Sequence, residues 1–245
     1  YGLTFWKFTV TPGVRAELVR TSREDDLTTL STNSFDATVL PGVGLTYAVR
    51  RDLDLVAGVH RGYSPVGPGQ EDRADPETSI AYELGARYQR PRRGRLLEVM
   101  GFVNDYSNLL GQCAFSTGCD AMRLDEQYNG GQVVVFGVEA VGTLRIDFGD
   151  VEVPLRATYT YTDSRFRDAF EVADPTLGEV VRGDRLPYIP MHQAQLQLGV
   201  EHERAGGTLS ATYVGEMREQ AGQGDDGERT ERYVGLDANV WVRVH

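Results

Sequence analysis

Long apolar runs are missing from this sequence. No stretch approaches the roughly 20 consecutive apolar residues that a membrane-spanning helix needs. Hydrophobic residues make up 40% of the 245 residues, and the mean hydropathy is −0.36. A helical membrane protein is therefore excluded. A transmembrane β-barrel is not, because only every second residue of a barrel strand faces lipid.

Basic residues are scarce as well. The chain has 25 Lys and Arg against 36 Asp and Glu, a formal net charge of −11. Nucleic-acid binding depends on basic side chains that neutralise phosphates, so no nucleic-acid partner is expected. The first residues, YGLTFWKF, have neither an initiator Met nor the pattern of a signal peptide. We therefore expect the chain to begin in the middle of a longer protein.

Cysteine and histidine are few. Cys113 and Cys119 lie close together in a segment of small and polar residues, which favours a disulfide in an oxidising compartment over a metal site. The four histidines have no spacing typical of a metal or catalytic site, and His192 and His202 are a full strand apart. No metal and no catalytic residue are predicted.

Alternation with a period of two recurs along the whole chain, whereas no segment keeps a helical period. In the segment 151–161, Val151, Val153, Leu155, Ala157, Tyr159 and Tyr161 share one face. Such patterns run for about ten residues, long enough for a tilted strand to cross a bilayer. About ten strands are predicted, near residues 6–20, 36–49, 53–63, 77–89, 95–106, 132–148, 151–164, 191–203, 208–217 and 231–244.

The connections between these strands alternate between short and long. Short turns are predicted at 50–52, 90–94, 149–150 and 204–207, and long polar stretches at 64–76, 107–131 and 165–190. Outer-membrane barrels have this layout, with tight periplasmic turns and long extracellular loops. The predicted fold is all-β: a transmembrane antiparallel meander in which neighbouring strands pair and the Val151 face points outward.

The opposite faces of the predicted strands carry many charged residues. A small barrel could not bury them without severe desolvation, whereas a wide lumen keeps them hydrated or paired. A soluble β-sheet protein with one wet face is the alternative. The predicted inner-face ions are Arg15, Glu17, Glu83, Arg87, Glu98, Glu139, Arg145, Arg156, Asp237 and Arg243.

Several runs, taken in order, resemble the C-terminal half of the barrel of TonB-dependent receptors, most closely the ferric dicitrate transporter group. These runs are LPGVGLTYAV at 40–49, LVAGVHRGYSPVGPG at 55–69, ETSIAYELGARYQ at 77–89, GFVNDYSNLLG from Gly101, YNGGQVVVFGVEA at 128–140 and LPYIPMHQAQLQLGVEH at 186–202. The likeness spans nearly the whole chain.

The resemblance implies a 22-stranded outer-membrane barrel with an N-terminal plug, which imports a ferric chelate with energy relayed by TonB. Residues 1–245 would then be a partial barrel of about ten strands without the plug, the TonB-binding segment or the final strands. Iron would be carried as a chelate substrate, and no cofactor is expected. A passive porin and, less favoured, an outer-membrane barrel enzyme are the alternatives; no nucleophile motif supports an enzyme.

Arginines in the predicted loops are the candidate ligand contacts, because guanidinium groups suit the carboxylates of citrate-like chelators. Catecholate and hydroxamate siderophores stay open as alternatives. The predicted ligand-binding residues are Arg61, Gln112, Arg123, Arg165, Arg167, Arg182 and Arg185.

Two charged segments point to the membrane surface. The acidic run at 222–229, which includes Asp225 and Asp226, is interpreted as a solvated loop tip that divalent ions could bridge to lipopolysaccharide. The turn RPRRGR at 90–95 would face the periplasmic leaflet, where basic side chains can meet lipid phosphates, although a solvated charge run is the simpler interpretation. Outer-membrane lipid and lipopolysaccharide are thus expected partners.

Overall fold

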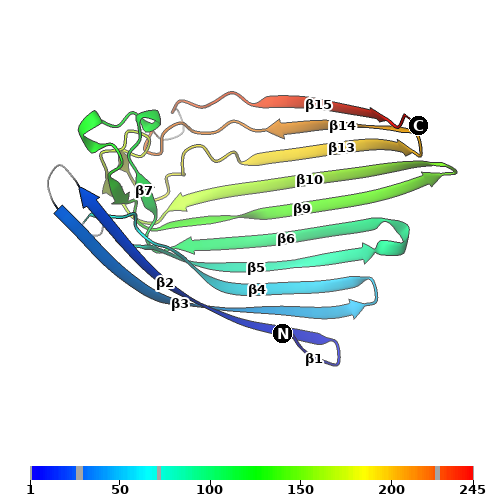
Figure 1. Cartoon of the computed structure of the whole chain (residues 1–245), viewed down its shortest axis with the longest axis horizontal. Coiled ribbons are helices and arrows are strands. Elements are labelled where there is room, and N and C mark those ends of the chain that lie inside the picture. The colour runs from blue at the N-terminus through cyan, green and yellow to red at the C-terminus, as the bar shows by residue number, and fades with distance from the viewer. Residues whose placement is uncertain (1, 26–29, 71–72, 224–226, 245) are drawn as a thin grey trace.

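The computed structural model describes residues 2–25, 30–70, 73–223 and 227–244. Eleven strands within these residues form one antiparallel sheet, in the order β1-β2-β3-β4-β5-β6-β9-β10-β13-β14-β15 (Figure 1). Their bounds are Leu3–Phe5, Phe8–Asp25, Leu30–Arg50, Leu53–Ser64, Glu77–Arg90, Arg95–Tyr106, Val133–Phe148, Val151–Phe166, His192–His202, Ala205–Val214 and Tyr233–Val242. The predicted all-β meander is confirmed.

The connections add only small elements. One hairpin pairs β7 (Leu110–Gln112) with β8 (Gln127–Asn129), and another pairs β11 (Phe170–Glu171) with β12 (Glu179–Val180). Three short 3-10 helices are η1 (Pro91–Arg93), η2 (Phe115–Thr117) and η3 (Ala121–Arg123). Within the described ranges, no helix has the length and apolar character that a membrane span requires.

The first two predicted strands differ from the structure at their ends. The segment expected to begin at residue 6 is a hairpin instead, because Trp6 adopts a positive φ of 52° and Phe5 pairs with Phe8. The second strand continues to Asp25 and the third begins at Leu30, well beyond the predicted ends at 20 and 36. The backbone pairing of this hairpin continues beyond Leu18, where the apolar alternation of the second strand ends.

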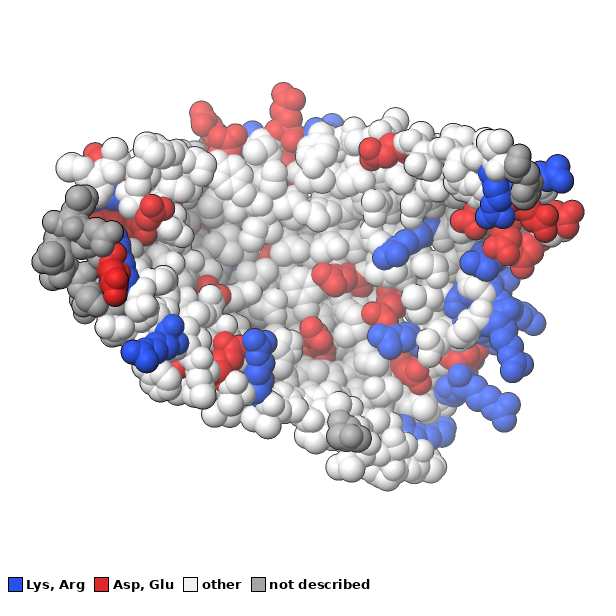
Figure 2. Space-filling model, viewed as in Figure 1, with Lys and Arg blue, Asp and Glu red and all other residues white. Residues whose placement is uncertain are grey.

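The two faces of the sheet differ in polarity, as the alternation predicted. Apolar side chains line up across neighbouring strands on one face: Leu155 is opposite Leu198, which is opposite Leu209. Leu84 and Leu236 on this face are 68% and 71% exposed. The other face is hollowed and carries charged residues (Figure 2). So much exposed apolar surface on one side suits a wall that faces lipid.

The two ends of the sheet also differ. The turn end has tight connections at residues 51–52, 91–94, 149–150 and 203–204, and Gly94 and Gly149 adopt the left-handed conformation that such turns need. The loop end has long connections at 65–76, 107–132, 167–191 and 215–232. In Figure 1 the loop end lies on the left and the turn end on the right. The predicted separation of short turns and long loops is confirmed, except at the extended β2–β3 hairpin.

A small hydrophobic core, here called the loop core, joins the connections at the loop end. Val133 and Phe166 pair across β9 and β10 and are 0% and 1% exposed. Leu177, Val180 and Ala221, from two different connections, pack with them. Partly buried side chains from the connection 107–132 complete the cluster. The long connections are therefore packed structures with shared buried side chains.

Candidate ligand-binding site

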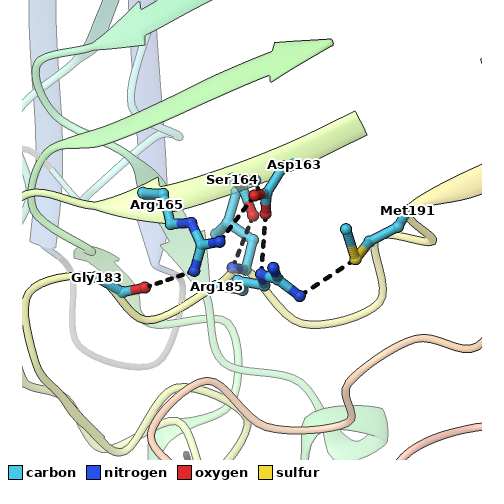
Figure 3. A network of polar contacts seen from close by, with 7 residues as sticks. Asp163, Ser164, Arg165, Gly183, Arg185 and Met191 are labelled. Carbon is cyan, nitrogen blue, oxygen red and sulfur yellow. Dashed lines mark hydrogen bonds and ion pairs between the residues drawn. The ribbon is translucent and has the colours of Figure 1, made fainter. Parts of the chain in front are cut away.

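Asp163 organises the loop end of β10. Its side chain is 6% exposed and forms ion pairs with two of the predicted ligand-binding arginines. The Arg165 guanidinium lies 2.8 Å from Oδ2 of Asp163, and the Nε of Arg185 lies 2.9 Å from Oδ1 (Figure 3). One buried carboxylate thus compensates two cations that approach it from different segments of the chain.

Further hydrogen bonds fold the segment 183–191 back onto β10. Arg165 donates to the carbonyl oxygen of Gly183 at 3.2 Å. The backbone N–H of Leu186 donates to Oγ of Ser164 at 3.0 Å, and Arg185 contacts the sulfur of Met191 at 3.2 Å (Figure 3). Arg165 and Arg185 consequently stabilise the conformation of this connection. Their positive charges are partly compensated by Asp163 and are therefore less available to an external ligand.

A pocket of about 370 Å³ lies beside this network. Four arginines line it, Arg185, Arg218, Arg229 and Arg232, against the two acids Asp163 and Glu216. Four positive charges minus two negative charges give a formal charge of +2, with His192 neutral. The pocket is therefore locally positive in a chain whose net charge is −11. The remaining lining residues are Thr162, Ser164, Leu186, Ile189, Met191, His192, Tyr213 and Gly215.

Two contacts fix the sides of this pocket. Nδ1 of His192 and the hydroxyl of Tyr159 are 2.9 Å apart, which orients the imidazole at the start of β13. Arg229 forms an ion pair with Glu216 across the connection between β14 and β15. Polar and apolar groups therefore converge on one concave site, as in ordinary small-molecule pockets.

The other predicted ligand residues are dispersed. Arg167 forms an ion pair with Asp105 at 3.0 Å, and Gln112 donates to Asp125 at 3.3 Å. Arg123 and Arg182 are exposed, and neither side chain has a hydrogen-bond or ion-pair partner in the part of the chain that the structure describes. Of the predicted set, Arg185 belongs to the pocket.

Arg61 occupies a different position. The register pairs it with Ile80, which puts it on the apolar face of the sheet, just past His60, where the pairing of β3 with β4 ends. It lines a separate open hollow with Arg15 and Glu17. Arg61 thus lies apart from the pocket beside Asp163.

Sequence reasoning missed Arg218, Arg229 and Arg232. The signal was present, because Arg229 and Arg232 lie just before a clear strand and Arg218 lies near the start of the same connection. The acidic run of the same connection was interpreted as a loop tip, and its Asp225 and Asp226 lie outside the described residues. What the sequence did not reveal is that this connection folds against 185–191.

Cys113 and Cys119 are joined in a disulfide, with their Cα atoms 5.6 Å apart. Asp174 lies close enough for its carboxylate and the two sulfurs to form a compact group. Because both sulfurs are bonded to each other, they do not offer the thiolates that a metal ion would require. Asp174 instead accepts hydrogen bonds from Thr176 and from Tyr128. Burial and this hydrogen bond raise the pKa of the Tyr128 hydroxyl.

A family model described as TonB dependent receptor-like, beta-barrel matches residues 1–243. The chain therefore belongs to this family, whose members are receptors and transporters rather than enzymes and whose barrels are outer-membrane proteins. No match was found among curated protein sequences.

Among solved structures, the chain resembles the siderophore receptor PiuA from Acinetobacter baumannii, with a TM-score of 0.73 and 17% identity over 98% of this chain and 35% of that one. The ferric citrate transporter FecA matches with a TM-score of 0.69 and 17% identity over 97% and 35%. The ferric-catecholate import receptor Fiu from E. coli K12 matches with 0.65 and 18% identity over 98% and 36%. This chain spans about a third of the length of these receptors.

Proposed function

We propose that the protein is an outer-membrane receptor that imports a ferric chelate with energy supplied through TonB. Membership of the TonB-dependent receptor family supports this proposal, as do receptors for siderophores and ferric citrate among the similar structures. In this arrangement the turn end faces the periplasm and the loop end faces the outside. The hollowed polar face would line the lumen.

The arginine-lined pocket beside Asp163 is the observation that carries the choice of an anionic chelate. Its formal charge of +2 is held at the loop end, where an external ligand would first meet the wall. Guanidinium groups bind carboxylates through paired hydrogen bonds, which suits citrate-type chelators. We therefore propose Arg232, Arg218 and Arg185 as contacts, with the exposed Arg182 and Arg123 as secondary candidates.

Binding of ferric citrate to the complete protein that carries this chain tests the proposal. We expect R232Q and R218Q each to weaken binding about tenfold at low salt, since a charge-assisted hydrogen bond contributes about 1.5–3 kcal/mol. R20Q, which removes an exposed arginine from β2, is the matched control. Unchanged affinity in both pocket variants, with normal membrane insertion, would assign the chelate to another site.

Uptake must be tested separately from binding. Accumulation of labelled iron that persists after deletion of TonB, or an open conductance in planar bilayers, would identify a passive porin. Competition with a catecholate and with a hydroxamate siderophore would establish the chelate class. Loss of uptake without TonB, together with saturable ferric citrate binding, is the expected result.

A further inference from the structure

The turn end carries a local concentration of arginine. Two adjacent connections and the strand ends beside them contain Arg50, Arg51, Arg90, Arg92, Arg93 and Arg95, all exposed. Within 50–54 and 90–95, six arginines stand against Asp52 and Asp54, a formal charge of +4. Figure 2 shows this basic region at the right end of the molecule. These residues are called the basic rim below.

Asp52 joins the two connections into one surface. It forms ion pairs with Arg50 at 2.9 Å and with Arg90 at 2.7 Å. The backbone N–H of Gln89 also donates to the carbonyl oxygen of Asp52 at 3.0 Å. By contrast, the side chains of Arg51, Arg92, Arg93 and Arg95 have no partner among the residues that the structure describes. Four of the six arginines of the basic rim therefore form no direct ion pair within the described chain.

The strand register brings two of these cations together on the apolar face. Arg90 of β5 is directly opposite Arg95 of β6, in the same alternation as the paired Tyr88 and Leu97. Like charges directly opposite one another destabilise a sheet, and Asp52 relieves only Arg90. An anion bound between the strands would remove the repulsion. Leu97, 51% exposed, would lie beneath it on the apolar face.

The remainder of the turn end has the opposite character. The connections around 147–152 and 201–204 contain Asp147, Asp150, Glu152, Glu201 and Glu203, with Arg145 and Arg204. Arg145 is already paired with Glu152 at 3.3 Å. Asp147, Glu152 and Glu201 line a hollow together with Arg92, Arg93 and Arg95, so these acids border the basic rim on one side. The excess of positive charge nevertheless lies in one half of the rim, which argues against a uniformly solvated ring of charges.

We propose that the basic rim binds the headgroup of an anionic phospholipid in the periplasmic leaflet. The phosphate would lie against Arg95, Arg93 and Arg92, while the acyl chains follow the apolar face along Leu97 and Leu84. Each arginine near the membrane surface contributes on the order of a fivefold preference for an anionic lipid over a neutral one. The inference rests on the membrane orientation proposed above.

Retention of lipid by the complete receptor tests this inference. The protein is released from nanodiscs that contain equal parts of phosphatidylglycerol and phosphatidylethanolamine, and retained lipids are identified by native mass spectrometry. We expect enrichment of phosphatidylglycerol in the wild type and an about fivefold loss for each arginine removed in R93Q/R95Q. Arg243 lies beside Arg204 in the acidic half, since its backbone N–H donates to the carbonyl oxygen of Arg204. The control R204Q/R243Q removes the same charge from that half and should keep the enrichment.

Three results would overturn the inference: no enrichment in the wild type, equal loss in both double variants, or saturable binding of inorganic phosphate without lipid enrichment. Heat-modifiable migration of both variants on gels establishes that each barrel is folded. Failure of the proposed function is distinguishable, because that would appear as absence from the outer membrane or loss of chelate uptake. A receptor that inserts and transports but retains no anionic lipid contradicts only this inference.

Discussion

The hydroxyl of Tyr128 donates a hydrogen bond of 2.9 Å to the carboxylate of Asp174, across 46 residues of sequence. Asp174 is 1% exposed and belongs to the connection between β10 and β13, whereas Tyr128 belongs to the connection between β6 and β9. This contact closes the loop core on one side. It is one of several hydrogen bonds that link these two connections, another being the bond from the backbone N–H of Gln132 to the carboxylate of Asp168.

Removing that hydroxyl should loosen the loops and leave the sheet intact. In Y128F the ring still packs, but the buried carboxylate loses a donor, which costs about 1–3 kcal/mol. Hydrogen exchange should accelerate in 107–132 and 167–191 and stay unchanged in the strands. Y188F, which alters a 52% exposed tyrosine, is the control. Equal protection in Y128F and the wild type would contradict a stabilising role for this bond.

Alkaline pH should weaken the same contact. The pKa of Tyr128 is raised in the folded loops by burial and by its hydrogen bond to Asp174, while an unfolded tyrosine titrates near pH 10. The folded state therefore holds its proton more tightly, so its stabilisation is complete below about pH 10 and falls as the pH rises further. The difference in tyrosinate absorbance between wild type and Y128F should titrate later than free tyrosine. A difference curve centred near pH 10 would contradict this expectation.

A close approach of strands should make Gly137 intolerant of a side chain. A Cβ at this position would lie 2.0 Å from the carbonyl oxygen of Tyr161 and 2.8 Å from the ring of Phe102. G137A should destabilise the barrel by about 1–3 kcal/mol through overpacking, measured by the temperature of heat-modifiable gel migration. Gly142 in the same strand has nothing within 4 Å of such an atom, so G142A should behave as wild type.

Neutralising Asp163 should release the segment 183–191. In D163N both Arg165 and Arg185 lose their counter-ion, and the loss is moderated because their side chains are 41% and 25% exposed. We expect about 1–3 kcal/mol less stability in this connection and faster cleavage by trypsin at Arg182 and Arg185. D150N, an exposed change at the turn end, should not alter cleavage. Identical digestion of all three proteins would show that the ion pairs are dispensable.

Loss of the disulfide should have a local effect. The bond closes a loop with a sequence separation of 6, and a loop this small is stabilised by about 2 kcal/mol. C113S/C119S should therefore increase hydrogen exchange within 110–129 without changing the melting temperature of the barrel. A large drop in that temperature would mean that the loop core supports the wall.

Strand faces could be predicted from sequence because the alternation is local. The predicted face of each residue from Val151 to Tyr161 agrees with the structure, where the register pairs the apolar face with Leu198 and Leu196. The extension of β2 to Asp25 could not be predicted in this way, because the apolar alternation on one face of the strand ends at Leu18 while the backbone pairing continues. Turn positions were predictable from Gly94 and Gly149, whose positive φ the tight connections require.

The candidate site was harder to predict because its residues come together through loop packing. Arg165 and Arg185 were selected for their charge, yet both are held by Asp163. The i, i+2 spacing of Asp163 and Arg165 on one strand face was a local sign of that pairing. The approach of 215–232 to 185–191 includes a hydrogen bond from the backbone N–H of Tyr188 to the carbonyl oxygen of Arg218, a contact without a sequence pattern.

The shared core beneath the long connections also restricts how the outer surface can move. Because Val133, Phe166, Leu177, Val180 and Ala221 bury one another, lifting any one connection exposes apolar surface from the others. We therefore expect these connections to move together, as one packed unit attached to the loop ends of β9 and β10. An insertion or deletion in one connection must be matched by changes in its neighbours. The sequences of these connections should therefore change together among related proteins.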